Sequence, residues 1–251
     1  MRRLSEINAK IGTVDIPQRV ERERYFAELS DVELAALFAG PLKPRVLTQW
    51  ADVAPEGAIG LVAPFPLTHR KPPAGTKLWP TDATTGDFRD NPLAREALAA
   101  LKAAVAQLRA GSVIFRSAES FSPSAANRDL LTRFFSEIAV FDPPVQRVWI
   151  PGGLWNVRTA AKVARELGVT CAFDPLVREP GEPPEIHYEL EADSLYMRIE
   201  GAGRSGAIRS EKLDELADLV THYEDRELTI AFASPERWSD ARNFKKLLDA
   251  D

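Results

Sequence analysis

Four polar side chains spread along the chain are of types suited to catalysis: one imidazole, two carboxylates and one guanidinium. They are His69, Asp174, Glu200 and Arg116. An imidazole with two carboxylates suits a divalent metal ion, and the same groups can serve as a general acid and base. The competing interpretation is structural. In it, His69 bonds to loop backbone, and the acids pair with Arg198 and Arg116.

Histidine and cysteine are scarce in this chain, which limits metal chemistry. There are three histidines and one cysteine. His187 lies in an acidic stretch and His222 near a helix end, where a solvent-facing role is favoured. Cys171 lies in an apolar run and is expected to be inert core. We therefore predict no metal ligands and no internal disulfide, and the cofactor stays unknown.

A glycine-rich segment, Gly201–Gly206, follows one apolar run, and Ser234-Pro235 follows the next. Barrel enzymes often bind phosphate at such places through loop amides and a helix N-terminus. Gly201 and Gly203 would supply the amides, and Arg204 a charge-assisted fork. Ser234 would cap the helix that follows. The alternative is a crossover that needs glycine only for its turns.

Two of the five tryptophans, Trp155 and Trp238, lie near the ends of apolar runs. They could stack on a sugar or a base, although packing over a loop is the favoured interpretation. The chain contains no GxSxG elbow, Walker loop or HExxH helix. These missing motifs argue against α/β-hydrolase, P-loop and zincin proteins.

The elements that must position these side chains alternate in type. Short apolar runs rich in β-branched residues predict strands at 10–14, 57–63, 112–116, 146–150, 169–173, 194–200 and 227–233, with a weaker run at 31–38. Helical spacing predicts helices at 19–29, 44–54, 154–167, 209–223 and from 234 to 248. Two more helices are predicted, one opened by Asn91-Pro92 and stopped by Gly111, the other opened by Ser122-Pro123.

Strands that alternate with helices imply parallel pairing and right-handed crossovers. Eight such units in 251 residues predict a single α/β domain over residues 1–251, a closed (β/α)8 TIM-type barrel. An open doubly wound sheet is the alternative. The barrel would carry a long loop at 64–91 after strand three and an irregular excursion at 175–193 after strand six. Its functional side chains would lie at the carboxyl ends of the strands.

Overall composition is that of an ordinary globular protein, with 45% hydrophobic and 27% charged residues. The formal charge is −5. An acidic chain disfavours nucleic acid as a partner, although His69, Arg70, Lys71 and Lys77 lie close together in the 64–77 segment. No stretch approaches the roughly 18 apolar residues of a membrane helix, so we expect a cytoplasmic protein.

Several stretches, taken in order, resemble a known family. They are Trp50 with Pro55-Glu56-Gly57, the 57–63 strand, Thr68-His69, the 113–121 segment with Asn127, Phe173-Asp174-Pro175, and Tyr196–Gly201. Together they resemble the YecE-like family, a bacterial and archaeal group called domain of unknown function 72. The resemblance spans nearly the whole chain and implies a TIM-type barrel. The function of that family is not established.

The resemblance also marks which positions are kept and which differ. Thr68, His69, Asp174 and Arg198 match the pattern of the family. A Glu and an Arg usually follow the fifth strand, but here Ile150 takes the acid position and Gly152 lies where the Arg is missing. The remaining departures are Arg116 for a Gln, Glu200-Gly201 for a His-Gly, and Ala233-Ser234 for an Asn pair.

Three functions follow as hypotheses. The first is an enzyme that acts on a polar or phosphorylated small substrate at the carboxyl ends of the strands, with Asp174 or Glu200 as base and Arg116 or Arg204 as anion clamp. The second is a binding or regulatory module that has lost part of its catalytic set. The third, least favoured, is a nucleic-acid-binding or endonuclease-like barrel. Substrate, reaction and oligomeric state are not predicted.

Overall fold

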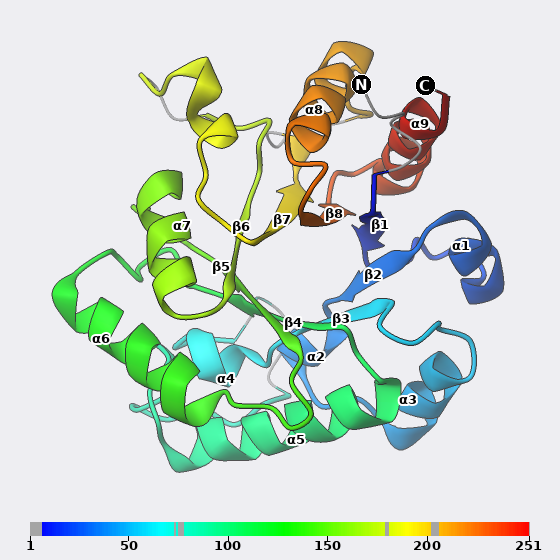
Figure 1. Cartoon of the computed structure of the whole chain (residues 1–251). Helices are drawn as coiled ribbons and strands as arrows, with labels where there is room; N and C mark the ends of the chain where they lie inside the picture. The colour runs from blue at the N-terminus through cyan, green and yellow to red at the C-terminus, as the bar shows by residue number, and fades with distance from the viewer. Residues whose placement is uncertain (1–6, 73, 75–77, 179–180, 202–205, 251) are drawn as a thin grey trace. The chain divides into compact units, whose positions relative to one another are not determined.

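The computed structural model describes residues 7–72, 74, 78–178, 181–201 and 206–250. Within them, eight strands form a closed parallel barrel in chain order (Figure 1). The strands are β1 (Ala9–Val14), β2 (Asp31–Leu34), β3 (Ile59–Val62), β4 (Ser112–Arg116), β5 (Gln146–Ile150), β6 (Thr170–Phe173), β7 (Ser194–Ile199) and β8 (Glu227–Phe232). The predicted TIM-type barrel is therefore confirmed, and the weak 31–38 run contains a strand.

The helices follow the strands, as the alternating pattern predicts. They are α1 (Arg22–Glu28), α2 (Ala36–Ala39), α3 (Pro44–Ala51), α4 (Phe65–Thr68), α5 (Pro92–Leu108), α6 (Ala125–Arg133), α7 (Val157–Glu166), α8 (Ser210–His222) and α9 (Arg237–Ala250). A π-helical turn, Phe134–Ile138, continues α6, and a 3₁₀ turn, Pro184–Tyr188, lies in the excursion after β6. No helix in the described ranges combines the length and apolar character that crossing a membrane requires.

The backbone clusters into two compact units. One, called here the terminal unit, joins Met1–Glu33 to Ala172–Asp251, and the other, the central unit, is Leu34–Cys171. A single domain over residues 1–251 stays a prediction.

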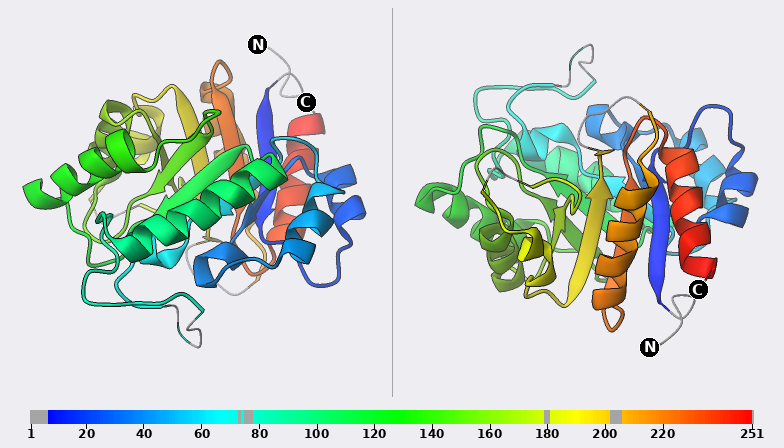
Figure 2. Two further views of the ribbon diagram at one scale, coloured as in Figure 1. Left: turned by 90° about the horizontal axis from the view of Figure 1, so that it is seen from below. Right: turned by 90° about the horizontal axis from the view of Figure 1, so that it is seen from above.

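In the terminal unit, β7, β8 and β1 pair in parallel, with Arg198 opposite Ala231 and Gly12 opposite Ala231 from the other side. Helices α8 and α9 lie side by side over these strands (Figure 2, right). Their buried faces carry Leu213, Leu216 and Phe244. Alternation along β7 sends Leu195, Met197 and Ile199 to one side, so that Tyr196 and Arg198 share the other side.

In the central unit, β3, β4 and β5 pair in parallel, with Ile114 opposite Val62 and Val148. The long helix α5 packs against α3, α4 and β3. Its start is as predicted: Asn91 caps it, because the side-chain oxygen accepts a hydrogen bond from the Ala94 amide at 2.8 Å. Phe88, Phe115, Phe134 and Phe135 form a buried aromatic cluster.

Several predicted helix boundaries are misplaced, and at three of them the local reason is clear. Helix α5 ends at Leu108, and Arg109 caps it in the left-handed conformation. Gly111 does not stop the helix; it is required because a Cβ there would overlap the Gly57 carbonyl. Helix α6 is capped by Ser124 rather than by Ser122, since the Ser124 hydroxyl accepts from the Asn127 amide. Helix α7 starts at Val157 because the Asn156 side chain caps it.

Two predicted irregular segments contain short regular elements. The connection at 64–91 begins with α4, whose residues are all buried. The excursion at 175–193 contains the 3₁₀ turn.

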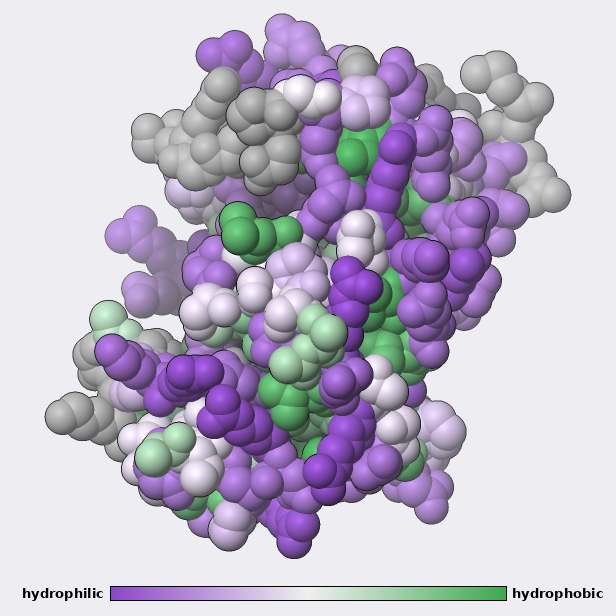
Figure 3. Space-filling model, turned by 90° about the vertical axis from the view of Figure 1, so that its left-hand side faces the viewer, coloured by the Kyte–Doolittle hydropathy of each residue, from purple (hydrophilic) through white to green (hydrophobic). Residues whose placement is uncertain are grey.

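Exposed large hydrophobic side chains are few among the described residues: Leu78, Val140, Leu154 and Val177. On the face shown in Figure 3, hydrophobic residues lie in patches among hydrophilic ones.

Candidate functional site

In the terminal unit, several polar side chains surround one guanidinium, that of Arg198 on β7. Its Nε donates to both carboxylate oxygens of Glu33, at 3.2 and 3.3 Å, and its Nη1 donates to Glu200. The Arg198 side chain is only 10% exposed and the Glu33 side chain is not exposed at all, whereas Glu200 is 58% exposed. The arginine thus joins a buried carboxylate to one that faces solvent.

Tyr196, two residues earlier on the same side of β7, completes the support for Glu33. Its hydroxyl donates to Glu33 Oε2 at 2.9 Å. Burial, together with the nearby Glu33 charge, raises the pKa of Tyr196 well above its ordinary value, so the tyrosine stays a donor. The pKa of Arg198 is also raised, because the charges of Glu33 and Glu200 outweigh the opposing effect of burial. The guanidinium of Arg198 therefore stays charged.

Asp174 follows β6 directly and lies against Glu200. Its two oxygens accept hydrogen bonds from the Leu176 amide at 2.9 Å and the Glu200 amide at 2.8 Å. Burial raises the pKa of this carboxyl, and these two amides offset only part of the rise. A carboxyl with a raised pKa, held by backbone at a strand end, is suited to proton transfer. We call Glu33, Asp174, Arg198 and Glu200 the acid–arginine cluster.

The other predicted residues of the terminal unit lie around this cluster or apart from it. Gly201 has φ +71°, and a Cβ there would lie 3.6 Å from Ser234, an ordinary contact. Ser234 does not cap α9 as predicted: its hydroxyl donates to the buried Asp240 carboxylate at 2.6 Å, and α9 begins at Arg237. Trp238 stacks on Tyr25, with ring centroids 5.5 Å apart. Gly203 and Arg204 lie outside the described residues.

In the central unit, the predicted residues Thr68, His69 and Arg116 lie together at the ends of α4 and β4. The Thr68 hydroxyl and His69 Nδ1 are 2.8 Å apart. Phe38 joins the other two: its ring centroid is 5.0 Å from that of the imidazole and 5.5 Å from the Arg116 guanidinium. Burial, and then the charge of Arg116, lower the pKa of His69 to about 4. The imidazole is therefore neutral at pH 7.

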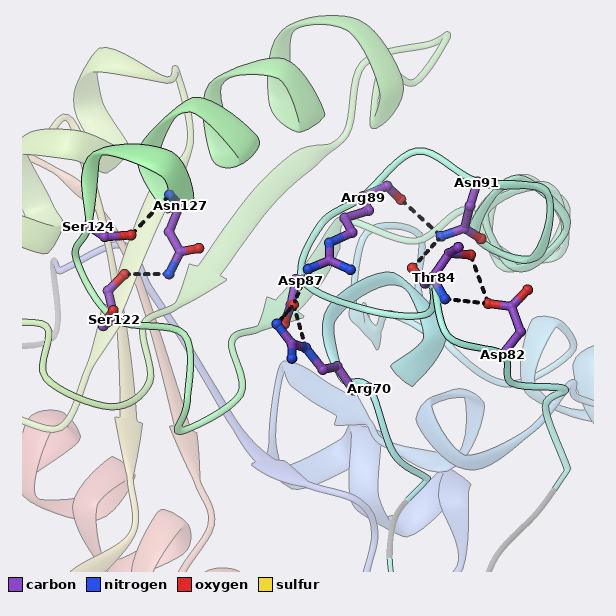
Figure 4. Close-up of polar contacts among 9 residues, drawn as sticks. All are labelled: Arg70, Asp82, Thr84, Asp87, Arg89, Asn91, Ser122, Ser124 and Asn127. Carbon is purple, nitrogen blue, oxygen red and sulfur yellow. Dashed lines mark hydrogen bonds and ion pairs between the residues drawn. The ribbon is translucent and has the colours of Figure 1, made fainter.

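Arg70 and Arg89, which flank this group in the 64–91 connection, share one carboxylate, that of Asp87 (Figure 4). Nε of Arg70 lies 2.6 Å from Asp87 Oδ2, and Nη2 of Arg89 lies 3.2 Å from the same oxygen. The Asp87 side chain is buried, whereas the side chains of Arg70 and Arg89 are 63% and 40% exposed. We call His69, Arg70, Arg89 and Arg116, with Asp87, the basic cluster.

Trp155 and the two remaining histidines have structural contacts. The Trp155 indole donates to the Phe121 carbonyl at 2.8 Å, and its ring packs edge-on against Trp149. His187 is buried and stacked on Phe173, so the solvent-facing role predicted for it is wrong. His222 is exposed near the end of α8, and its Nε2 lies 3.0 Å from the Tyr188 carbonyl.

The part of the chain that the structure describes contains no preformed set of metal ligands. No group of three or more His, Cys, Asp or Glu side chains is placed there to hold an ion. Cys171 is buried and unbridged, and burial raises its pKa to about 12, which agrees with the prediction of an inert core residue.

Two members of the terminal-unit site, Glu33 and Tyr196, were not nominated from the sequence. A signal was present: Asp31 and Glu33 alternate with Val32 and Leu34 in a predicted strand, which places two acids on one side of it. An acid on the inner side of a barrel strand is buried, and a buried carboxylate needs a partner. Arg198, also predicted within a strand, is that partner.

Comparisons with known proteins agree with the fold. No protein-family model matches the chain, and no curated protein matches it. Two DUF72 family structures resemble it: one from Thermotoga maritima (16% identity, TM-score 0.64, covering 96% of this chain and 99% of that one) and one from Enterococcus faecalis (12%, 0.67, 96% and 95%). These are structures of the family that the sequence motifs resemble, and the low identities fit a divergent relative.

A barrel enzyme is also similar in structure. The 3-keto-D-glucoside 4-epimerase of Escherichia coli is 10% identical, with a TM-score of 0.58 and coverage of 97% of this chain and 100% of that one. At these identities the likeness establishes the fold and leaves the chemistry open. The chain is thus a TIM-barrel protein with DUF72 proteins among its structural neighbours.

Proposed function

We propose that this protein is a divergent YecE-like barrel that binds a small hydroxylated substrate at the carboxyl ends of β6 and β7 and moves a proton on it. The observation that carries the proposal is the acid–arginine cluster. Arg198 is held by the buried Glu33 and in turn holds Glu200, beside Asp174. Barrel enzymes carry their chemistry at this end of the strands.

The carboxylates of Asp174 and Glu200 would have different roles. Asp174 is fixed by two backbone amides, and its pKa is raised by burial, so it would exchange the proton. Glu200 is more exposed and is oriented by Arg198 through one oxygen, so its other oxygen would accept a hydrogen bond from a substrate hydroxyl. Arg198 would stabilise negative charge that develops on the substrate.

The charge of this cluster favours a neutral substrate group over a phosphate. Three carboxylates and one guanidinium sum formally to −2, which repels an anion. A structural neighbour whose name states sugar epimerisation supports a sugar-like substrate for this chain. Phosphate binding by the 201–206 segment is a separate proposal, because Gly203 and Arg204 lie outside the described residues.

The test follows hydrogen exchange at carbon. Purified protein is incubated with neutral aldoses and ketoses in D2O, and proton NMR follows loss of the hydrogen next to the carbonyl. We expect protein-dependent exchange for one substrate, reduced about 100-fold or more in Asp174→Asn. Glu211→Gln, on the exposed side of α8, is the control and should exchange as wild type does.

A binding module without catalysis gives a different pattern. Thermal shift or calorimetry would then detect a neutral sugar whose affinity falls in Glu200→Gln, while no exchange occurs. That result would retain the site and reject the enzyme. If no neutral sugar binds and none exchanges, the proposed function is wrong.

A further inference from the structure

The central unit contains a cavity of about 530 Å³ at the amino ends of β5 and β6. Gln146 and Thr170, the first residues of these two strands, lie in its wall. Its volume falls within the range of about 300–1,000 Å³ that is typical of small-molecule sites. The proposed function does not use this cavity, because barrel chemistry is expected at the carboxyl ends of the strands. The cavity is therefore a candidate site for a second ligand.

Most of the residues that line this cavity are apolar. Phe135, Phe141 and Leu167 are among them, together with Val140, which is 49% exposed. Phe135 belongs to the π-helical turn, Phe134–Ile138. Such turns are rare and are frequently found at functional sites. The wall therefore favours a ligand with an apolar body, whose burial would be the main source of affinity.

Among the described residues that line the cavity, only Arg147 is charged. Its Nη1 donates to the carbonyls of Phe135 and Ala139, at 2.6 and 3.4 Å, and its Nη2 donates to the Gly168 carbonyl at 3.2 Å. Phe135 lies in the π-helical turn, Ala139 ends that turn, and Gly168 follows the C-terminal cap of α7. The guanidinium is thus anchored between the ends of two helices, and its place in the wall is fixed.

Within the described ranges, the hydrogen-bond acceptors of Arg147 are all neutral carbonyls. Burial lowers the pKa of Arg147, and no carboxylate of these ranges offsets that effect. A guanidinium has five N–H groups, so the three bonds leave Nε–H and one hydrogen of Nη2 for a ligand. Arg95 shows what this pair of nitrogens can bind: its Nε and Nη2 donate to the two oxygens of Asp90, each at 2.7 Å. Nε and Nη2 of Arg147 are thus suited to one carboxylate.

We propose that this cavity binds a small monocarboxylate with an aromatic or aliphatic body. The carboxylate would pair with Nε and Nη2 of Arg147, and the body would pack against Phe135, Phe141 and Leu167. One carboxylate balances one guanidinium, whereas a phosphate dianion would leave a negative charge against an apolar wall. The proposal stands on the central unit alone and does not depend on the acid–arginine cluster.

Calorimetry with three probe compounds separates the charge of the ligand from its apolar body. The first compound, 4-phenylbutyrate, has both, 4-phenylbutyramide has the same shape without the charge, and acetate has the charge without the body. We expect 4-phenylbutyrate to bind, and the amide and acetate each to bind at least about tenfold more weakly, because each lacks one of the two groups that the cavity recognises. An amide that binds as tightly as the carboxylate would show that Arg147 does not recognise the ligand.

Variants locate the binding. Replacing Arg147 would also break its bonds to three carbonyls, so the test changes Val140, an exposed residue of the wall. Val140→Glu places a negative charge beside the carboxylate and should weaken 4-phenylbutyrate binding at least about tenfold. Leu154→Glu is the matched control, because Leu154 is also an exposed hydrophobic residue but does not line the cavity.

Three results would overturn the proposal. It is wrong if none of the three compounds binds, or if 4-phenylbutyramide binds as tightly as 4-phenylbutyrate. It is also wrong if Val140→Glu affects binding no more than Leu154→Glu does, because the carboxylate would then bind elsewhere on the protein.

Discussion

Arg198 on β7 and Glu33 on β2 form a buried ion pair, with Nε 3.2 Å from Oε1. A charged pair without exposure is costly to form, but removing one partner is costlier, because the other charge is left without compensation. Here the pair has a directional consequence. The buried Glu33 carboxylate holds Nε of Arg198, so that Nη1 of the same guanidinium meets Glu200.

The first prediction concerns this pair. Glu33→Gln keeps the shape of the side chain but removes the charge that Arg198 and Tyr196 face. We expect a loss of about 3 kcal/mol in the free energy of unfolding, measured by urea denaturation. Glu211→Gln, an exposed residue on α8, should change it by less than about 0.5 kcal/mol. Equal values for both variants would show that the ion pair contributes nothing.

The second prediction concerns Asp31, whose carboxyl is buried with one oxygen, Oδ2, lacking a hydrogen-bond partner among the described residues. Burial raises its pKa to about 7; the Lys10 charge opposes the rise and Glu33 adds to it. Between pH 4 and 7 the folded protein therefore holds a proton that the unfolded chain has lost, so stability falls as pH rises. The full loss, complete above pH 7, is about 4 kcal/mol.

Asp31→Asn removes this titration and so provides the measurement. Urea denaturation across the range from about pH 4 to pH 8 should show wild type losing stability relative to the variant as pH rises. Groups that do not interact with Asp31 titrate alike in both proteins and cancel in the difference. Parallel stability curves would mean that Asp31 is ionised in the folded protein throughout this range.

The third prediction uses Cys171, the single cysteine of the chain. With its pKa raised to about 12 by burial, only about one thiol in 10,000 is ionised at pH 8. Ellman's reagent should therefore fail to react with the native protein over hours and should label one thiol rapidly in urea. Rapid labelling without denaturant would show that β6 opens readily.

The fourth prediction tests residues 86–88, whose amides donate to carbonyls of α4, the helix that leads directly into His69. Gly86 has φ +85°, and an added Cβ would lie 2.6 Å from the Arg70 amide nitrogen. Gly86→Ala should lower the free energy of unfolding by about 3 kcal/mol. It should also move the NMR signals of His69, because the backbone of His69 and Arg70 must move away from the added Cβ. Gly181→Ala is the matched control: its φ is +91°, but among the described residues no atom outside its chain neighbours lies within 4 Å of the added Cβ.

The control separates conformational strain from steric overlap. Gly181→Ala should cost only about 1 kcal/mol, the ordinary penalty for a left-handed residue with a Cβ, and His69 should be unaffected. A similar cost at both glycines, without any change at His69, would mean that the 86–88 stretch does not position the imidazole.

Local patterns carried most of the information about the barrel. The runs at 112–116 and 146–150 match β4 and β5 residue for residue, because buried parallel strands are short, continuous apolar segments. Asn91 and Pro92 marked the start of α5, because capping depends on neighbouring residues. Where several local signals competed, as at Ser122, Ser124 and Asn156, the boundary was misplaced by two or three residues.

The functional residues depended on contacts between distant segments. Asp174, Arg198 and Glu200 were recognisable because they lie at strand ends, where chemistry is expected in a barrel. Glu33 and Tyr196 were not, because their importance comes from an ion pair and a hydrogen bond that span more than 160 residues of chain. The sharing of Asp87 by Arg70 and Arg89, and the strained backbone beneath it, likewise exist only after folding. Local sequence sets which segments become strands and helices, whereas burial in the folded chain decides which charges must find each other.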